Sequence, residues 1–302
     1  MSSAMLRRNL GIALVTALLS PASFAWAEDA VADESLPAHL SDRGAGLPTS
    51  RFGTYVREGE WLVELAGEYL KNQGFEYDPN ELGFGVPIGS FKGRYEATRG
   101  LVFVAYGLSD RFAVELEANG IDASLRKAAD DPSSMPEKLT ESGLGQVRSR
   151  LDWRWLPERG RRPELFSYAE VVFPHDKEKA LIGTADWVIN GGLGAIRGFR
   201  WGTMTVRLGF EYDTSSASAV DFHEYAIEYL KRLSPKVSVY LGYVVFEGDE
   251  ASLATELHWS PNPRVMIRLG NRLGVVSSTL SATPNGLDWA PTIGVVLRSF
   301  RR

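Results

Sequence analysis

The chain has 302 residues and no cysteine, with 44% hydrophobic and 24% charged residues and a mean hydropathy of −0.15. Its formal net charge of −5 argues against nucleic-acid binding, because a surface that tracks phosphates needs an excess of Lys and Arg. Outside the N-terminus, no apolar run reaches the roughly 18 residues that a membrane-spanning helix needs. The composition leaves two classes open: a soluble globular protein and a membrane β-barrel whose hydropathy averages out.

Residues 1–27 have the features of a secretory signal peptide. Arg7 and Arg8 precede an uncharged apolar stretch from Leu10 to Leu19, and a small-x-small triplet ends at Ala27. We therefore expect export, with cleavage after Ala27. Because the chain has no Cys, neither a disulfide nor a lipidated N-terminal Cys is expected.

The next segment, residues 28–57, is acidic and contains Ala, Ser, Gly and Pro without a sustained apolar period. This composition predicts a flexible leader, located in the periplasm after export. The remaining residues, 58–302, are predicted to form the folded domain.

From about Glu60 onward, apolar residues recur at every second position, which is typical of strands with one apolar face. In residues 201–212, for example, Val206 and Phe210 share the apolar face, whereas Thr205 and Arg207 share the other. Such segments number about twelve, and they are 60–72, 91–108, 111–121, 143–156, 164–174, 184–197, 200–213, 221–234, 236–247, 251–260, 263–274 and 287–300.

The links between these segments alternate between short and long. Tight links such as 109–110 alternate with longer ones such as 73–90 and 122–142, although 248–250 is short where length is expected. Outer-membrane barrels have an even number of antiparallel strands, short periplasmic turns and longer outer loops. We therefore predict an all-β fold, a transmembrane up-and-down antiparallel β-barrel of about twelve strands, in the outer membrane of a Gram-negative-type bacterium.

Tryptophan placement gives independent support for a barrel in lipid. Of the seven Trp after residue 27, six lie on the apolar face near strand ends, and Trp201 alone does not. Rings at strand ends are expected of the two aromatic girdles of a membrane barrel. A secreted β-sandwich or lipocalin-like barrel also alternates, but its aromatic residues would favour the middle of the strands, where a soluble core lies.

The polar face of the strands would then line a lumen that carries both signs of charge. Across the tight link 261–262, Glu256 falls opposite or diagonal to Arg268, where opposite charges can pair. Twelve strands enclose less space than a 16-stranded porin, so we expect a narrow and selective lumen. The candidate lumen-lining residues for transport are Glu115, Glu117, Arg148, Arg150, Arg207, Glu224, Glu228, Glu256 and Arg268.

Catalysis has little support in the sequence. His175-Asp176 and Asp221-Phe222-His223 lie near the loop ends of strands, where an omptin-type protease would carry acids and a histidine that activate water. No comparable second acidic pair faces them, and no Ser and His on neighbouring strands have an orienting partner. Asp130-Asp131 is interpreted as a solvated turn. We expect no cofactor and no metal, and predict that the protein is not an enzyme.

Short glycine-anchored motifs carry a resemblance to a known family. The run 106–112 (YGLSDRF), then 143–148 (GLGQVR), then Phe173-Pro174, resembles the outer-membrane family labelled "MetA-pathway of phenol degradation", in which a "ygltdr" hairpin precedes a "GlGDv" strand. The resemblance implies a transport-like barrel for small hydrophobic or aromatic compounds and supplies no catalytic residues. From the residues alone, glycines 143–145 and 190–194 are interpreted as bends or close backbone approaches in the barrel wall.

Taken together, these patterns predict an outer-membrane channel or transporter for a small solute. Two alternatives stay open: an outer-membrane hydrolase with its site at the loop rim, and a structural barrel without transport. The expected partners are outer-membrane lipid, the small-molecule solute and, during export, periplasmic chaperones and the barrel-assembly machinery. Nucleic acid is not expected as a partner.

Overall fold

The computed structural model describes residues 46–51, 53–80, 82–84, 89–176, 178–183, 186–213, 221–246, 250–275 and 288–299. All of them belong to one compact unit, Ser35–Arg302. The predicted signal peptide and most of the predicted leader lie outside the described residues. No helix within the described part of the chain is long and apolar enough to cross a membrane.

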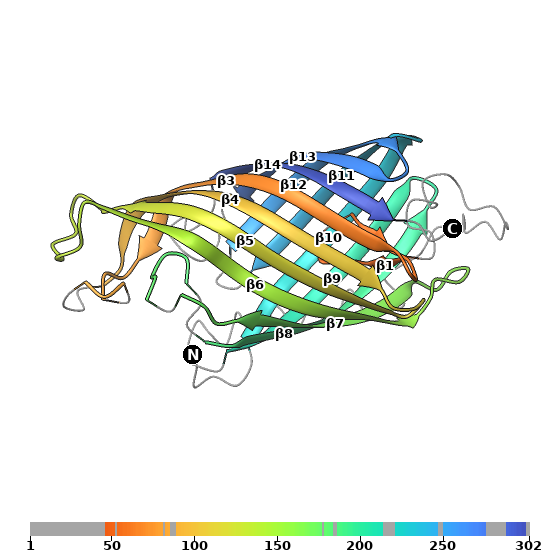
Figure 1. Cartoon of the computed structure of the whole chain (residues 1–302), viewed down its shortest axis with the longest axis horizontal. Helices are drawn as coiled ribbons and strands as arrows, with labels where there is room; N and C mark the ends of the chain where they lie inside the picture. The colour runs from red at the N-terminus through yellow and green to blue at the C-terminus, as the bar shows by residue number, and fades with distance from the viewer. Residues whose placement is uncertain are drawn as a thin grey trace, which may run out of the picture. The chain divides into compact units, whose positions relative to one another are not determined.

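Twelve of the strands in the described residues close into a single antiparallel barrel (Figure 1). Each strand pairs with its neighbours in sequence, and the ring closes where β14 pairs with β3. The predicted fold class is therefore confirmed. The barrel strands are β3 (Trp61–Tyr77), β4 (Phe91–Gly107), β5 (Phe112–Arg126), β6 (Lys138–Leu156), β7 (Glu164–Phe173), β8 (Val188–Phe199), β9 (Gly202–Asp213), β10 (Asp221–Ser234), β11 (Val237–Phe246), β12 (Glu250–Asn262), β13 (Val265–Val275) and β14 (Trp289–Ser299).

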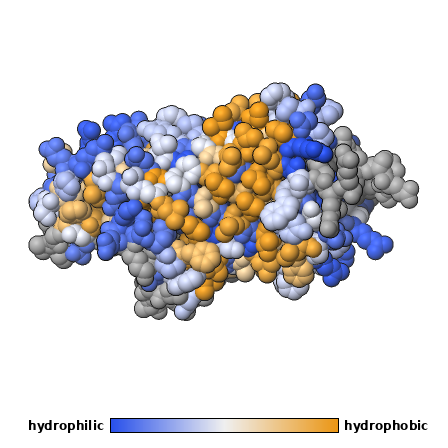
Figure 2. All heavy atoms as spheres, viewed as in Figure 1, coloured by the Kyte–Doolittle hydropathy of each residue, from blue (hydrophilic) through white to orange (hydrophobic). Residues whose placement is uncertain are grey.

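The two faces of the barrel wall differ as the alternation predicts. On β9, Phe210 is 46% exposed on the outside, whereas Arg207 is 2% exposed on the inside. Figure 2 shows hydrophobic residues gathered in a band across the barrel, with hydrophilic residues to either side. Such a band on the outside of a closed barrel is the surface that lipid covers.

The tryptophans lie at the strand ends of this outer surface. The six that the alternation places on the apolar face are all exposed. Trp201 is exposed as well, because it lies in the β8–β9 turn, where strand parity does not apply. Its ring stacks on Phe199 at a centroid distance of 4.6 Å and lies 5.5 Å from the ring of Tyr229. Trp201 therefore belongs to the aromatic set at the turn end of the barrel.

Strands β3, β5 and β6 are longer than the alternation predicts, and together with β4 they extend past the other strands at the loop end (Figure 1). Residues 73–77, 122–126 and 138–142 continue the strands instead of forming links. An apolar cluster explains the extension: Tyr77 and Leu125 are buried there together with Met135. Burial of these side chains stabilises strand pairing beyond the apolar band.

The glycine-rich stretches do mark close approaches in the wall. The register of β5 and β6 shifts between Ala118 and Gly120, next to the 143–145 stretch. A Cβ added to Gly192 or Gly194 would collide with the ring of Tyr168 or of Phe166, respectively. These glycines let two aromatic side chains lie flat across the inside of the wall, as the close-approach interpretation predicts.

A small hairpin precedes the barrel strands. Its strands are β1 (Leu47–Pro48) and β2 (Tyr55–Val56), which pair with each other as a separate two-stranded sheet. We call residues 46–57 the plug hairpin. They were expected to belong to a flexible leader, and here the structure differs, because Leu47 and Val56 are fully buried. The reason is that these apolar side chains find partners inside the barrel, which local composition does not reveal.

The plug hairpin contacts opposite walls of the lumen near the turn end. Leu47 and Val56 pack in one cluster with Phe103 of β4. Tyr55 packs in another with Phe166 of β7, and that cluster also contains residues of β8, β10, β11 and β12. The hairpin therefore crosses the lumen at that level.

Gly107, from the YGLSDRF motif, lies beside the residues that connect the plug hairpin to the first barrel strand. The N–H of Gly59 donates to the carbonyl of Gly107 at 2.8 Å, and Glu58 forms an isolated bridge with Gly107. A Cβ at position 107 would collide with the carbonyl of Arg57. The glycine of this motif is thus required by a close backbone approach.

Candidate functional site: a charged cavity above the plug hairpin

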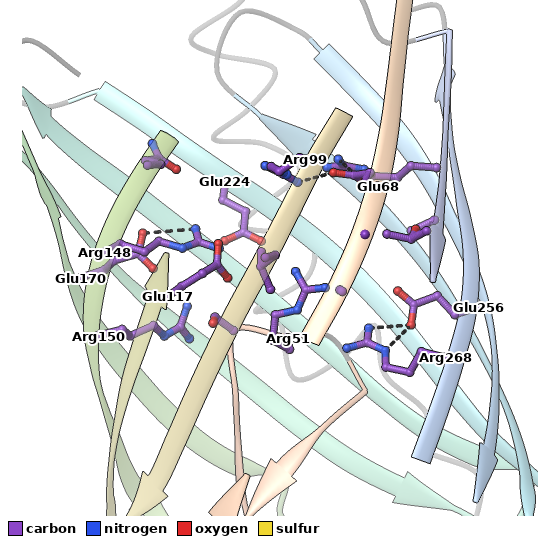
Figure 3. A pocket seen from close by; sticks show the side chains of 18 of the residues that line it. Arg51, Glu68, Arg99, Glu117, Arg148, Arg150, Glu170, Glu224, Glu256 and Arg268 are labelled. Atoms are coloured by element: carbon purple, nitrogen blue, oxygen red, sulfur yellow. Dashed lines mark hydrogen bonds and ion pairs between the residues drawn. The ribbon is translucent and has the colours of Figure 1, made fainter. Parts of the chain in front are cut away.

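A cavity of about 240 Å³ occupies the lumen, and Ser50 and Arg51 of the plug hairpin form part of its lining. Figure 3 shows charged side chains that reach toward it from several strands and from the hairpin. Twelve of its lining residues are charged. They are seven arginines (Arg51, Arg99, Arg148, Arg150, Arg207, Arg268 and Arg272) and five glutamates (Glu68, Glu117, Glu170, Glu224 and Glu256).

On one side of the cavity, a single carboxylate is shared by two guanidinium groups. Glu68 of β3 faces Arg99 directly across the β3–β4 ladder and accepts a hydrogen bond from it. Arg272 of β13 reaches the same carboxylate at 2.8 Å. The two arginine side chains are each 27% exposed, whereas that of Glu68 is 7% exposed. This group therefore carries one excess positive charge and turns guanidinium surface toward the cavity.

On the other side, one guanidinium group serves two carboxylates. Arg148 of β6 lies 2.9 Å from Glu117 of β5 and 3.6 Å from Glu170 of β7. Glu170 also accepts a hydrogen bond from the side-chain amide of Asn190 at 3.1 Å. Two carboxylates thus share one guanidinium group here, the reverse of the arrangement around Glu68.

At the floor, the plug hairpin joins a chain of ion pairs. Arg51 lies 3.2 Å from Glu64, which in turn lies 2.8 Å from Arg268. Arg268 pairs with Glu256 at 2.6 Å, and His258 contacts the same carboxylate at 2.8 Å. The predicted Glu256–Arg268 pair is confirmed, and the register places the two residues diagonally across β12 and β13.

Three further contacts hold the hairpin to the wall through its backbone. Arg207 donates to the carbonyl of Thr49 at 2.9 Å and pairs with Glu228 at 2.9 Å. The N–H of Ser50 donates to the carboxylate of Glu115 at 3.0 Å. Arg154 donates to the carbonyl of Gly46. Wall side chains thus satisfy backbone groups of the hairpin that would otherwise be buried without partners.

All nine predicted lumen residues point into the barrel. Seven line the cavity, whereas Glu115 and Glu228 lie beside it and contact Ser50 and Arg207, respectively. Their role in transport stays a prediction. Sequence reasoning missed Arg51, because it was placed in the leader, and Arg99.

The signal that could have revealed the plug hairpin is in β4. Residues 101–106 are apolar at every position, so both faces of this strand avoid water. Val102 is 48% exposed on the outside, whereas Phe103 is fully buried on the inside. A strand that is apolar on both faces is expected where something apolar covers each face.

The link between β7 and β8 folds against the inside of the loop end. Ile182 is buried against Ala97 and Ala123, which face each other across β4 and β5. The carboxylate of Glu141 accepts hydrogen bonds from the N–H groups of Ala180 and Leu181 at 3.1 and 2.7 Å. This link therefore covers part of the inner wall at the loop end.

The residues considered for catalysis make local contacts. The Nδ1 of His175 lies 3.2 Å from the carbonyl of Phe173, and the carboxylate of Asp176 pairs with Lys179 at 2.7 Å. The side chains of residues 221–223 lie outside the described residues.

Asp131 is buried rather than solvated, in contrast to the turn expected there. It accepts hydrogen bonds from the hydroxyl of Tyr77 at 2.8 Å and from the N–H of Ser133 at 2.7 Å. Burial by itself raises the pKa of Asp131, but these hydrogen bonds outweigh burial and hold the pKa below its ordinary value. Asp131 therefore fixes the link between β5 and β6 in place.

Comparison with solved structures agrees with this fold. An outer membrane channel from Pseudomonas putida F1 superimposes with a TM-score of 0.55 and 13% identity, covering 84% of this chain and 100% of that one. The NanC porin gives a TM-score of 0.46 at 9% identity, with 78% and 98% coverage. The Ralstonia pickettii toluene transporter TbuX gives 0.39 at 11% identity, with 80% and 88% coverage.

The likeness to the Pseudomonas putida channel and the closed twelve-stranded ring define the class of fold, an outer-membrane-type β-barrel. No protein-family model matches the sequence. No curated protein matches it either. The resemblance to the family labelled "MetA-pathway of phenol degradation" therefore stays a prediction.

Proposed function

We propose that the protein is an outer-membrane channel for a small solute and that the plug hairpin closes the channel in this conformation. The observation that carries the proposal is the charged cavity inside a closed barrel, with a floor that is not part of the barrel wall. Because β1 and β2 pair only as a sheet of their own, the hairpin can leave the lumen without breaking the barrel ladder.

Two observations support the proposed location in the outer membrane. The barrel exposes a band of large hydrophobic side chains whose ends carry Trp, and outer-membrane lipid is the partner that fits such a band (Figure 2). The neighbour from Pseudomonas putida is named a channel, and its whole length aligns with this chain. Folding in that membrane would require the chaperones and assembly machinery through which exported barrels pass.

Electrical recording tests the proposal. The Leu47→Asp variant introduces a charge into the apolar contact between hairpin and wall, without changing any barrel strand, and Leu47→Val is its matched control. In planar bilayers we expect rare openings for the unmodified protein and for Leu47→Val, and frequent or permanent openings for Leu47→Asp. A charge buried in an apolar cluster without a partner is strongly unfavourable, so the hairpin should leave the lumen.

Folding must be checked before conductance is interpreted. A closed barrel migrates differently in SDS gels before and after boiling, so all three proteins should show heat-modifiable mobility. Folded Leu47→Asp protein that neither conducts ions nor passes solutes into liposomes would overturn the channel proposal and favour a structural barrel.

A further inference from the structure

The chemistry of the solute can be inferred from the three-residue group of Glu68, Arg99 and Arg272. Two guanidinium groups share one carboxylate, so one positive charge is left uncompensated within the group. The guanidinium side chains are about four times as exposed as the glutamate, at 27% against 7%. Because these side chains point into the lumen, the surface that a solute meets there is cationic.

Both arginines also have hydrogen-bond donors to spare. A guanidinium group carries five N–H donors in a planar fork. Arg99 and Arg272 each donate to Glu68 through Nη2, and both side chains line the cavity. Such a fork matches a carboxylate, which accepts two parallel hydrogen bonds from it. The group can therefore hold a second carboxylate beside that of Glu68.

The opposite side of the cavity limits how many negative charges enter. Glu117 and Glu170 share Arg148, so a second anionic group on the solute would be repelled where it approached these two carboxylates. The volume of about 240 Å³ is below the range typical of pockets for drug-sized ligands, which favours a small molecule.

We propose that the cavity binds a small monocarboxylate and that Arg99 and Arg272 are its carboxylate site. The inference rests on the proposed function for its physiological meaning, since it names the class of solute that the channel passes. The binding site itself is tested without reference to conduction.

Calorimetry on the folded full-length protein in detergent is the direct test, with benzoate and benzamide as a matched pair. The two probes share a ring and differ in charge. We expect benzoate to bind at least about tenfold more tightly than benzamide, since charge-assisted hydrogen bonds to two arginines are formed only with benzoate.

Two variants make opposite predictions for benzoate. Arg272→Gln removes half of the site, and its dissociation constant for benzoate should rise about tenfold. Glu68→Gln removes the internal competitor and frees both guanidinium groups, so benzoate should bind several-fold more tightly. Arg126→Gln, at the exposed loop end of β5, is the control and should leave binding unchanged.

The signs of these effects separate a binding site from a structural role. If Glu68→Gln and Arg272→Gln both weaken binding, or if benzoate and benzamide bind alike, the carboxylate site is refuted. Benzoate binding with no ion or solute flux in Leu47→Asp would refute the channel and leave the site. Conductance without any preference for benzoate would refute the site and leave the channel.

Discussion

The lumen contains two regions that the same alternating strands build in opposite ways. Near the turn end, part of the inner face is apolar, and there Leu62 and Phe103 pack on Leu47 and Val56 of the plug hairpin. Above the hairpin, the inner face carries the arginines and glutamates of the cavity (Figure 3). The same barrel strands run through both regions. In the first region the wall faces the plug hairpin, and in the second it faces the cavity.

This difference shows what decides the character of an inward position. Where apolar side chains of the hairpin meet the wall, hydrophobic burial stabilises the contact and an unpaired charge would be costly. Where no chain segment occupies the lumen, the charged side chains pair with one another and line the cavity. Arg51 stands at the boundary, because it belongs to the hairpin but pairs with Glu64 of the wall.

The apolar region should be the more sensitive of the two to truncation. Phe103→Ala removes a fully buried ring from the contact with the hairpin, and we expect a loss of about 3–5 kcal/mol in the free energy of unfolding. Val102→Ala, the neighbouring residue on the lipid side, is the control and should cost about 1 kcal/mol or less. Urea titration in lipid vesicles measures both, and equal losses would contradict the two-region description.

In the charged region, the depth of an arginine should decide its contribution. Arg268 is 4% exposed and joins Glu64 to Glu256, so Arg268→Gln leaves two carboxylates without their shared partner. We expect a loss of about 3 kcal/mol in the free energy of unfolding. Arg272→Gln, at 27% side-chain exposure, should cost about 1 kcal/mol or less in the same titration. A reversed order would mean that burial is not what sets the contribution of these ion pairs.

At the boundary, Arg51→Gln tests how the two regions are joined. The side chain is 19% exposed and its pair with Glu64 is partly screened, so the barrel should lose only about 1 kcal/mol of stability. The hairpin should nevertheless be held less firmly, and openings in planar bilayers should become more frequent. Openings that stay as rare as in the unmodified protein would show that the apolar contacts alone hold the hairpin.

The smallest effect is expected outside the lumen, at Asp131. Its pKa is lower in the folded protein than in the unfolded chain, so the carboxylate stabilises the β5–β6 link above its unfolded pKa of about 3.8. That contribution is lost as the pH falls through the lower, folded pKa. Limited proteolysis of intact liposomes should therefore cut this link faster at acidic pH. In the Asp131→Asn variant, the protease should cut this link faster than in the unmodified protein at neutral pH. The cutting rate should depend little on pH, and the barrel itself should stay intact.

The twelve strands follow from local patterns, because lipid on the outside imposes an apolar residue at every second position along each strand. The nine predicted lumen residues follow from the same parity. The strand ends do not follow from this parity. Strands β3, β5 and β6 continue past the apolar band because Tyr77, Leu125 and Met135 bury one another, and that contact joins residues far apart in the chain.

What the sequence by itself determined is the closed barrel and which side chains face inward, since both depend on a period of two that any strand in lipid must keep. Only the tertiary structure decided what the inward side chains meet. Leu47 and Val56 lie in a stretch whose composition is that of a disordered leader, and they are ordered because a distant apolar face of β4 covers them. Likewise, Arg99 and Arg272 become one site because closure of the ring places β13 and β4 on either side of β14 and β3. Contacts of this kind depend on three-dimensional proximity, which local periodicity does not encode.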